Sequence, residues 1–452
     1  MLFSSLDFFY FFIVYLLAWF LAPKKFKLTI IVLFSLFFYG YWNYYYSLFP
    51  VVLTLLAYIC AFYINASSPY INRITLFLSI FLVSVPLIYF KYFNFIFNTN
   101  TVNLSLPLGI SFITFTLISY IIDVSKKRYP IEKNFNILLG YILFFPQLIA
   151  GPILRPSELI PQLKNLPIVT NKMRILAITI FTIGLAKKLI FADQLAPYVD
   201  SVYASPTTAL YHEWLIAIYG FSVQIYCDFS GYSDMAIGLA LFFGIKLPIN
   251  FDRPYLATTV PDIWRKWHIT LSTWFRDYIY FPIAGRKTNI QLHFFAALFT
   301  MTVCGFWHGA SWNFILWGFL NGLLVAITNL LRIKRIKIPF PTALKIFLTF
   351  HWWVFSTILF RSTDLSNAMD VCAQAINWST FNIFALKEYI FPIILITIFF
   401  MSHYFDQFSR VEKITNQINK KYLFLFLLMI WIIAIVLGSS SEESEKFIYF
   451  DF

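Results

Sequence analysis

The sequence predicts an all-α polytopic membrane protein. Hydrophobic residues make up 60% of its 452 residues and charged residues only 12%. Soluble domains carry roughly 45–50% and 25% of these classes, so this chain has too few polar side chains to cover a water-soluble surface. Apolar runs of about the length that crosses a bilayer also recur from one end of the chain to the other. These observations exclude a soluble enzyme.

The expected membrane segments follow from these runs in chain order. They cover residues 7–21, 28–46, 49–64, 74–90, 137–149, 175–191, 209–225, 294–304, 314–331, 344–360, 389–401 and 422–437. A full span needs about 20 apolar residues, so we expect roughly 10–12 crossings, with the shorter runs tilted or re-entrant. The first run lacks a basic segment before it, which favours a span over a cleavable signal peptide.

The charged loops predict how the segments are oriented. The formal net charge is +13, and basic residues gather in short loops at Lys24, Lys25 and Lys27; Lys126, Lys127 and Arg128; Arg332, Lys334, Arg335 and Lys337; and Lys420 and Lys421. The positive-inside rule places these loops in the cytoplasm. Both termini, including the acidic residues Glu442, Glu443 and Glu445, are then expected outside.

The aromatic residues and the cysteines indicate which kinds of partner and site to expect in this membrane protein. Aromatic residues make up 21% of the chain, and clusters such as 39–46 are typical of interfacial belts. Lysines and arginines are not interleaved with these clusters, so a nucleic-acid partner is not expected. The four cysteines have no paired spacing, which indicates buried thiols and neither a metal site nor a disulfide framework. No linker separates soluble domains, so residues 1–452 are expected to form a single membrane-embedded domain.

A polar-rich stretch around His268 interrupts the apolar pattern. Pro261 and Asp262 suit the first turn of a helix. A stripe at three- and four-residue steps follows, formed by Trp264, Trp267, His268, Leu271, Trp274, Phe275 and Tyr278. The pattern predicts one continuous helix that points His268 with the aromatic side chains. An interfacial amphipathic helix with a hydrogen-bonded histidine is the alternative.

His308 lies in a second unusual segment, flanked by Gly305 and Gly309 and by tryptophans. Ionisable groups at membrane depth are costly, so they indicate function by default. Glycines alone would instead indicate helix packing through small residues. Two separate histidine motifs in one apolar chain favour a site.

Several segments in order resemble the membrane-bound O-acyltransferase family, and most closely its bacterial alginate O-acetylation branch. They are residues 106–112, 145–152, 224–238, 264–282, 307–310 and 447–452. The resemblance implies a single acyltransferase domain, formed by a ring of tilted helices around a thinned centre with a trans-membrane tunnel. It also implies that His308 is catalytic and that His268 is the second functional histidine.

The resemblance further implies an activity. An acetyl group would pass from cytoplasmic acetyl-coenzyme A across the bacterial inner membrane, for O-acetylation of an exopolysaccharide or cell-wall glycan. An external acyltransferase or esterase-like partner would complete the transfer to the glycan acceptor. The alternatives are transfer of D-alanine from a carrier protein toward teichoic acid, a non-enzymatic transporter of an anionic or lipid-linked substrate, and a non-catalytic scaffold.

Acyl transfer to a hydroxyl needs a base, and a neutral imidazole suits this role because its pKa lies near working pH. We therefore expect His308 to be the base, and His268 to polarise the thioester carbonyl or orient the donor. Four cations are expected to attract the phosphates of coenzyme A or an acidic carrier protein: Arg253, Arg265, Lys266 and Arg276. The alternative is that these four residues are cytoplasmic charges that follow the positive-inside rule and bind no ligand. Asp228 and Asp234 are expected to be structural partners of these cations, because a carboxylate in a membrane needs one.

Overall fold

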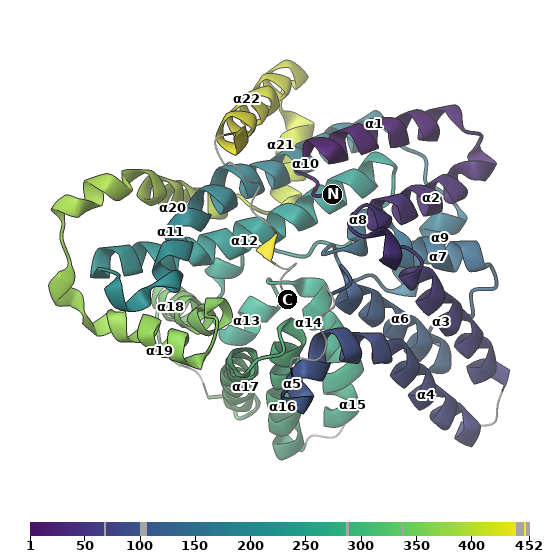
Figure 1. The fold of residues 1–452 in the computed structure, drawn as a ribbon, viewed down its shortest axis with the longest axis horizontal. Helices are drawn as coiled ribbons and strands as arrows, with labels where there is room; N and C mark the ends of the chain where they lie inside the picture. Colours follow the sequence, from purple (N-terminus) through teal and green to yellow (C-terminus); the bar gives the residue numbers. More distant parts are fainter. Residues whose placement is uncertain (67–68, 100–105, 286–288, 337, 440–446, 449–452) are drawn as a thin grey trace. The chain divides into compact units, whose positions relative to one another are not determined.

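The structure is a computed structural model that describes residues 1–66, 69–99, 106–285, 289–336, 338–439 and 447–448. Within these residues the regular structure is helical and no strand occurs (Figure 1). The prediction of an all-α protein is therefore confirmed. Lys337, the acidic residues Glu442, Glu443 and Glu445, and residues 449–452 of the terminal motif lie outside the described residues.

The chain divides into two compact units, and the first comprises Met1–Phe181 and Tyr232–Pro248. Its helices are α1 (Leu6–Leu21), α2 (Lys27–Gly40), α3 (Phe49–Ala66), α4 (Pro69–Leu87), α5 (Phe93–Phe97), α6 (Ile110–Ser125), α7 (Phe135–Leu143), α8 (Phe145–Leu148), α9 (Pro156–Lys164) and most of α10 (Asn171–Ala186). Three shorter turns of helix join them: η1 (Lys24–Phe26), η2 (Tyr44–Tyr46) and η3 (Ile88–Tyr92).

The second unit comprises Thr182–Gly231 and Ile249–Phe452. Its helices are α11 (Asp193–Ala204), most of α12 (Tyr211–Phe242), α13 (Val260–Trp264), α14 (Ile269–Phe275), α15 (Phe281–Ala284), α16 (Ile290–His308), α17 (Trp312–Ile333), α18 (Thr342–Arg361), α19 (Leu365–Ala373), α20 (Ile390–His403), α21 (Phe408–Gln417) and α22 (Lys420–Ser439). The shorter elements are η4 (Lys187–Ala192), η5 (Pro206–Thr208), η6 (Pro254–Leu256), η7 (Arg276–Tyr280), η8 (Gln374–Ile376), η9 (Trp378–Thr380) and η10 (Phe384–Tyr389).

Eight helical segments of the described chain are long and apolar enough to cross a membrane. They are Tyr44–Ile64, Asn72–Phe97, Asn171–Ala204, Ile290–His308, Trp312–Ile333, Thr342–Arg361, Phe384–His403 and Lys420–Gly438. Leu6–Leu21 and Ile110–Ser125 are shorter apolar helices. The protein is therefore a multi-pass membrane protein, while the full count of 10–12 crossings, the single-domain organisation and the ring with its tunnel stay predictions.

One apolar run predicted as a crossing behaves differently. Residues 137–149 form α7 and α8, two short helices separated at Phe144, and every residue from 138 to 149 is buried. A run of this length is too short to span a bilayer and suits a buried core helix. The other runs fall largely on helices.

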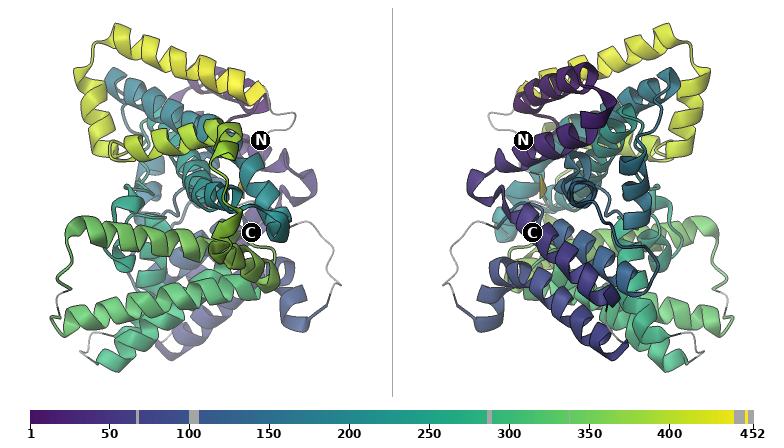
Figure 2. Two further views of the ribbon diagram at one scale, coloured as in Figure 1. Left: turned by 90° about the vertical axis from the view of Figure 1, so that its left-hand side faces the viewer. Right: turned by 90° about the vertical axis from the view of Figure 1, so that its right-hand side faces the viewer.

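Helices α16 and α17 pack along each other, and α17 also contacts α18 (Figures 1 and 2). The close approach depends on glycine: a Cβ on Gly305 would stand 2.2 Å from the Phe314 carbonyl oxygen, and one on Gly318 would stand 2.4 Å from that of Met301. Small residues let two helix backbones meet in this way. Helix packing through small residues, the alternative explanation of Gly305, thus applies to this residue.

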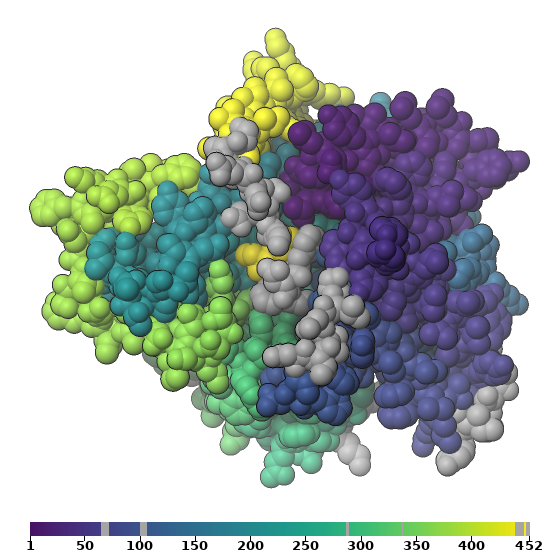
Figure 3. Space-filling view, viewed as in Figure 1, coloured from purple at the N-terminus to yellow at the C-terminus, as the bar shows by residue number. Residues whose placement is uncertain are grey.

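Helix α22 is the least buried of the eight candidate spans, with 11% of its apolar window inside the protein. In the space-filling view it lies at the surface (Figure 3). Its exposed side chains include Phe424, Ile432 and Val436. An apolar surface of this kind suits contact with lipid.

The cysteines are only partly as expected. Cys227 and Cys304 are buried, Cys60 is half-buried and Cys372 is exposed. All four are free thiols.

Candidate functional site

His268 lies at a break between two helices rather than within one. Helix α13 contains Pro261 and Asp262 in its first turn, as predicted, but it ends at Trp264. His268 then takes a left-handed conformation, with φ 43° and ψ 55°, and α14 begins at Ile269. The prediction of one continuous helix was wrong, because a left-handed residue cannot continue a right-handed helix.

The break is stabilised by a segment that is distant along the sequence. The Asp252 amide donates to the Lys266 carbonyl oxygen at 2.9 Å, and the Ile269 amide donates to the Asn250 carbonyl oxygen at 2.9 Å. These two bonds hold the backbone on either side of His268. Non-glycine residues in this conformation persist only where the surroundings determine it, and such residues are common at functional sites.

Asn250 also fixes the imidazole of His268. Its Oδ1 accepts from the Thr270 amide at 3.2 Å and from the Thr270 hydroxyl at 2.9 Å, and it lies 3.2 Å from His268 Nδ1. Because an amide oxygen only accepts, Nδ1 must be the donor in this contact. The ring proton is therefore on Nδ1, and the basic lone pair is on Nε2.

Aromatic side chains enclose both histidines, and one of them contacts both. His268 is 0% exposed and His308, the last residue of α16, is 2% exposed. The Trp307 ring centroid lies 6.3 Å from that of His268 and 4.9 Å from that of His308. Phe229 stands edge-on to His268 at 4.6 Å. The structure thus brings the two sequence-predicted histidines into one site.

The far side of His308 is formed by two further helices. Its ring lies 5.3 Å from Trp317 of α17 and 5.2 Å from Phe360 of α18. Gly309 follows in an extended conformation, and a Cβ there would stand 2.1 Å from the Phe314 ring. The glycines therefore pack the helices, while the adjacent histidine is held among aromatic rings. The packing and functional explanations of this motif are compatible.

A buried ion-paired cluster joins Lys188 of η4 and Asp193 of α11 to Asp228 of α12, the residue before Phe229. Lys188 bonds Asp193 at 2.7 Å and Asp228 at 2.8 Å, and all three side chains are at most 5% exposed. Asp228 Oδ2 also accepts from the Ile448 amide at 2.8 Å. The cation that pairs with Asp228 is thus Lys188 and none of the four that we expected. Sequence patterns do not show pairs between residues 40 positions apart.

A second polar network was also missed from the sequence. Asp406 accepts from Lys187 Nζ at 2.8 Å and from the Tyr226 hydroxyl at 2.6 Å. Burial raises the pKa of Asp406, but Lys187 and Tyr226 outweigh this effect and hold it below its usual value. The neighbouring His403 is 2% exposed and packs edge-on against the Tyr226 ring at 4.9 Å. His403 ends an apolar span without a motif, so nothing in the sequence marked it.

The four cations predicted to bind the donor are paired locally or exposed. Arg253 bonds Asp252 at 2.9 Å, Lys266 bonds Asp262 at 3.0 Å, and Arg276 bonds Asp277 at 2.8 Å. Arg265 is exposed. The bond between the Asp252 amide and the Lys266 carbonyl brings the segments of Arg253 and Lys266 together, whereas the ion pair of Arg276 is with its own sequence neighbour Asp277.

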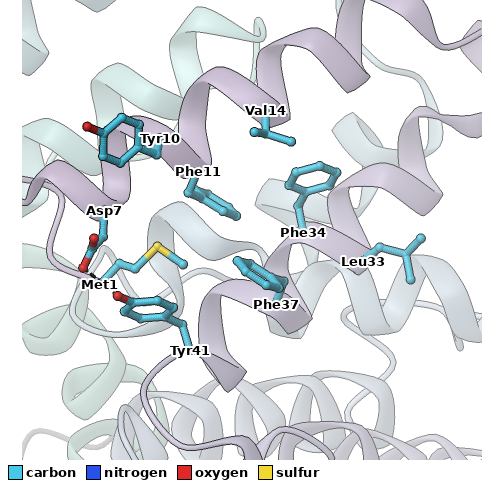
Figure 4. Close-up of a pocket in the computed structure, with 9 residues that line it drawn as sticks. All are labelled: Met1, Asp7, Tyr10, Phe11, Val14, Leu33, Phe34, Phe37 and Tyr41. Atoms are coloured by element: carbon cyan, nitrogen blue, oxygen red, sulfur yellow. Dashed lines mark hydrogen bonds between the residues drawn. The ribbon is translucent and has the colours of Figure 1, made fainter.

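The first unit carries an apolar hollow of about 540 Å³ between α1 and α2 (Figure 4). Its polar end is formed by Asp7 and Tyr41, whose hydroxyl donates to the carboxylate at 2.6 Å. The rest of the lining is mostly aliphatic and aromatic. Neither histidine nor any of the four cations lines this hollow.

The buried His268 predicts a dependence of stability on pH. Burial lowers its pKa well below the usual range, so its imidazole is neutral at pH 7. The unfolded chain takes up a proton below about pH 6.5 and the folded protein does not. Stability should therefore be complete above that pH and fall below it, by up to about 1.4 kcal/mol per pH unit.

Thermal unfolding in detergent between about pH 7 and pH 5 tests this expectation, because histidine side chains of the unfolded chain take up protons there and a variant at position 268 isolates the share of this one. The protein should lose more stability on acidification than a His268→Gln variant. Equal slopes for the two proteins would mean that the folded state does not exclude the proton from His268.

Comparison with known proteins places these residues in a wider context. A sequence model of the membrane-bound O-acyltransferase family matches residues 38–363. A peptidoglycan O-acetyltransferase of Helicobacter pylori is 36% identical over 75% of this chain and 72% of its own length. A probable alginate O-acetylase AlgI of Azotobacter vinelandii is 34% identical over 86% of this chain and 80% of its own. A teichoic acid D-alanyltransferase of Streptococcus thermophilus is 29% identical over 64% and 76%.

Proposed function

This chain belongs to the membrane-bound O-acyltransferase family and is an O-acyltransferase, and we propose that it moves an acetyl group from cytoplasmic acetyl-coenzyme A across the bacterial inner membrane. The acceptor is an exopolysaccharide or a cell-wall glycan, reached through an external partner enzyme. The observation that supports this proposal best is the pair of fully buried histidines, His268 and His308, in contact with one tryptophan ring.

His308 acts as the general base in this proposal. Its imidazole takes the proton from the attacking hydroxyl as the oxygen adds to the thioester carbonyl. The carbon–sulfur bond then breaks, and the proton passes to the departing thiolate to give free coenzyme A. The aromatic surroundings of His308 suit this step, because a dry site strengthens the interactions of the transferred proton.

The tautomer of His268 separates the two roles that we considered for it. Polarising the thioester carbonyl would need an N–H directed at the substrate, but the ring proton is on Nδ1, which donates to Asn250. Nε2 accepts instead. We therefore assign His268 the orienting role, in which Nε2 accepts a hydrogen bond from an N–H or O–H of the bound reactants.

The acyl donor decides between the acetyl and D-alanyl versions of this activity. Purified protein should be offered labelled acetyl-coenzyme A and, separately, a D-alanyl carrier protein, with a polysaccharide acceptor and its external partner present. We expect labelled O-acetyl esters on the glycan, identified by mass spectrometry. Esters formed only from the carrier protein would assign the chain to D-alanine transfer. With the protein reconstituted in sealed vesicles, passage of intact coenzyme A across the membrane would favour a transporter.

A further inference from the structure

Two arginines from distant parts of the chain converge on one backbone carbonyl. Arg410 of α21 donates to the Tyr404 oxygen at 2.9 Å, and Arg253 donates to the same oxygen at 3.5 Å. The Arg410 guanidinium also lies over the Tyr404 ring, 4.1 Å from its centroid. Both arginines are half-buried as whole residues. Two like charges therefore share an acceptor that carries only a partial negative charge.

The charge of this pair is only partly compensated. Arg253 has Asp252 as its partner. No carboxylate of the described residues lies within ion-pair distance of Arg410, and the nearby Asp406 is engaged by Lys187 and Tyr226. Arg410 also lies in the first turn of α21, which has no acidic residue and no side-chain cap. Because the helix dipole is positive at that end, a cation there is unfavourable unless an anion binds nearby.

The pair lies on the face that the donor is expected to approach. Residues 404–421, which run from the end of α20 into the first turn of α22, contain Arg410, Lys413, Lys420 and Lys421 against only two acids, Asp406 and Glu412. The positive-inside rule therefore predicts that this segment is cytoplasmic. Arg253 bonds the Tyr404 carbonyl oxygen at the start of this segment. Its neighbour Asp252 bonds the Lys266 carbonyl oxygen, two residues before the left-handed His268.

We propose that Arg253 and Arg410 form a clamp for a phosphate group of the acyl donor. The proposal rests on the proposed function and adds Arg410, which no motif marks, to the donor site. Guanidinium groups bind phosphate through paired hydrogen bonds, so two of them around one carbonyl can hold a phosphate without moving the backbone. The phosphate supplies the negative charge that the pair and the first turn of α21 lack.

The test uses coenzyme A as the probe and pantetheine, which carries no phosphate, as the matched ligand. Binding is measured by calorimetry on full-length protein in phosphatidylcholine nanodiscs. Arg410→Gln keeps a donor for the Tyr404 carbonyl but removes the charge, and Arg253→Gln does the same on the other side. Each should weaken coenzyme A binding between about tenfold and a hundredfold, which is the usual loss for a hydrogen bond to a charged group. Pantetheine binding should not change.

Lys413→Gln is the matched control, because Lys413 is exposed on the same helix one turn further on. It should bind coenzyme A like the unaltered protein. If an arginine variant melts at a lower temperature than the control, Arg410→Lys is used in its place. This substitution keeps the positive charge but removes the planar guanidinium with its paired N–H donors. The preference of the protein for coenzyme A over pantetheine should still fall.

The outcomes separate the clamp from the proposed function. Normal coenzyme A binding by Arg410→Gln would overturn the clamp while leaving acetyl-coenzyme A as the donor. Failure of the unaltered protein to bind coenzyme A or to use its acetyl ester would overturn the proposed donor, and the clamp with it. Nanodiscs containing phosphatidylglycerol form the last arm: if the variants change only the effect of that lipid, the anion is a lipid headgroup and the proposal is wrong.

Discussion

Replacement of His308 by alanine is expected to abolish acyl transfer while the protein stays folded. If His308 is the base, its removal should lower the rate by about 10²–10⁴-fold, the usual contribution of general-base catalysis. The imidazole packs between Trp307, Trp317 and Phe360. Truncation leaves a cavity there, but these rings and the glycine-mediated contact of α16 with α17 remain to hold the helices.

The measurement is acetylation of the acceptor glycan by mass spectrometry, with protein level and melting temperature followed in parallel. His351→Ala is a suitable control, because His351 is another histidine of the second unit and its ring bonds Tyr219 at 2.8 Å. It should retain activity. Loss of folded His308→Ala protein together with its activity would instead support a packing role for this histidine.

The largest effect on stability is expected for Lys188→Met. The substitution leaves Asp193 and Asp228 side by side without their cation, at 3% and 2% exposure. Removing one partner of a buried ion pair usually costs about 3–5 kcal/mol, because the charge left behind cannot be solvated. The variant should therefore melt far below the unaltered protein in detergent.

Lys266→Met is the matched control for this variant. Its pair with Asp262 has the same chemistry, but the side chains are 27% and 24% exposed, so its loss should cost no more than about 1 kcal/mol. Adding Asp193→Asn and Asp228→Asn to Lys188→Met should restore part of the stability, because no uncompensated charge then remains. Equal melting of the two lysine variants would contradict a buried ion-paired core at this position.

The sequence predicted the fold class because hydrophobicity is a local signal that repeats along the chain. The first turn of α13 was also predictable, since Pro261 and Asp262 act on the turn they occupy. The break at His268 was not, because it depends on Asn250 and Asp252, which pair with it from earlier in the chain. The three- and four-residue spacing of apolar side chains predicts which face of a helix a residue occupies, but it does not predict where that helix ends.

For the candidate site, too, residues within a sequence motif were predictable and contacts between distant segments were not. His268 and His308 were found because each lies in a motif, and their common contact with Trp307 agrees with one site. The partner of Asp228 and the contact between Arg253 and Arg410 through Tyr404 were missed. These contacts join segments that are 40 to more than 150 residues apart, and no spacing rule relates such positions.

The central claim is that the acyl group crosses the membrane while its carrier does not. Burying the phosphates of coenzyme A in hydrocarbon is prohibitive, whereas an acetyl group is small and uncharged. Sealed vesicles with the cytoplasmic face inward should be loaded with coenzyme A labelled in both the acetyl group and the adenine, and the external partner and glycan supplied outside. Acetyl label should appear on the external glycan while the adenine label stays inside. Intact coenzyme A outside, or acetyl label confined to acceptors inside, would contradict this account.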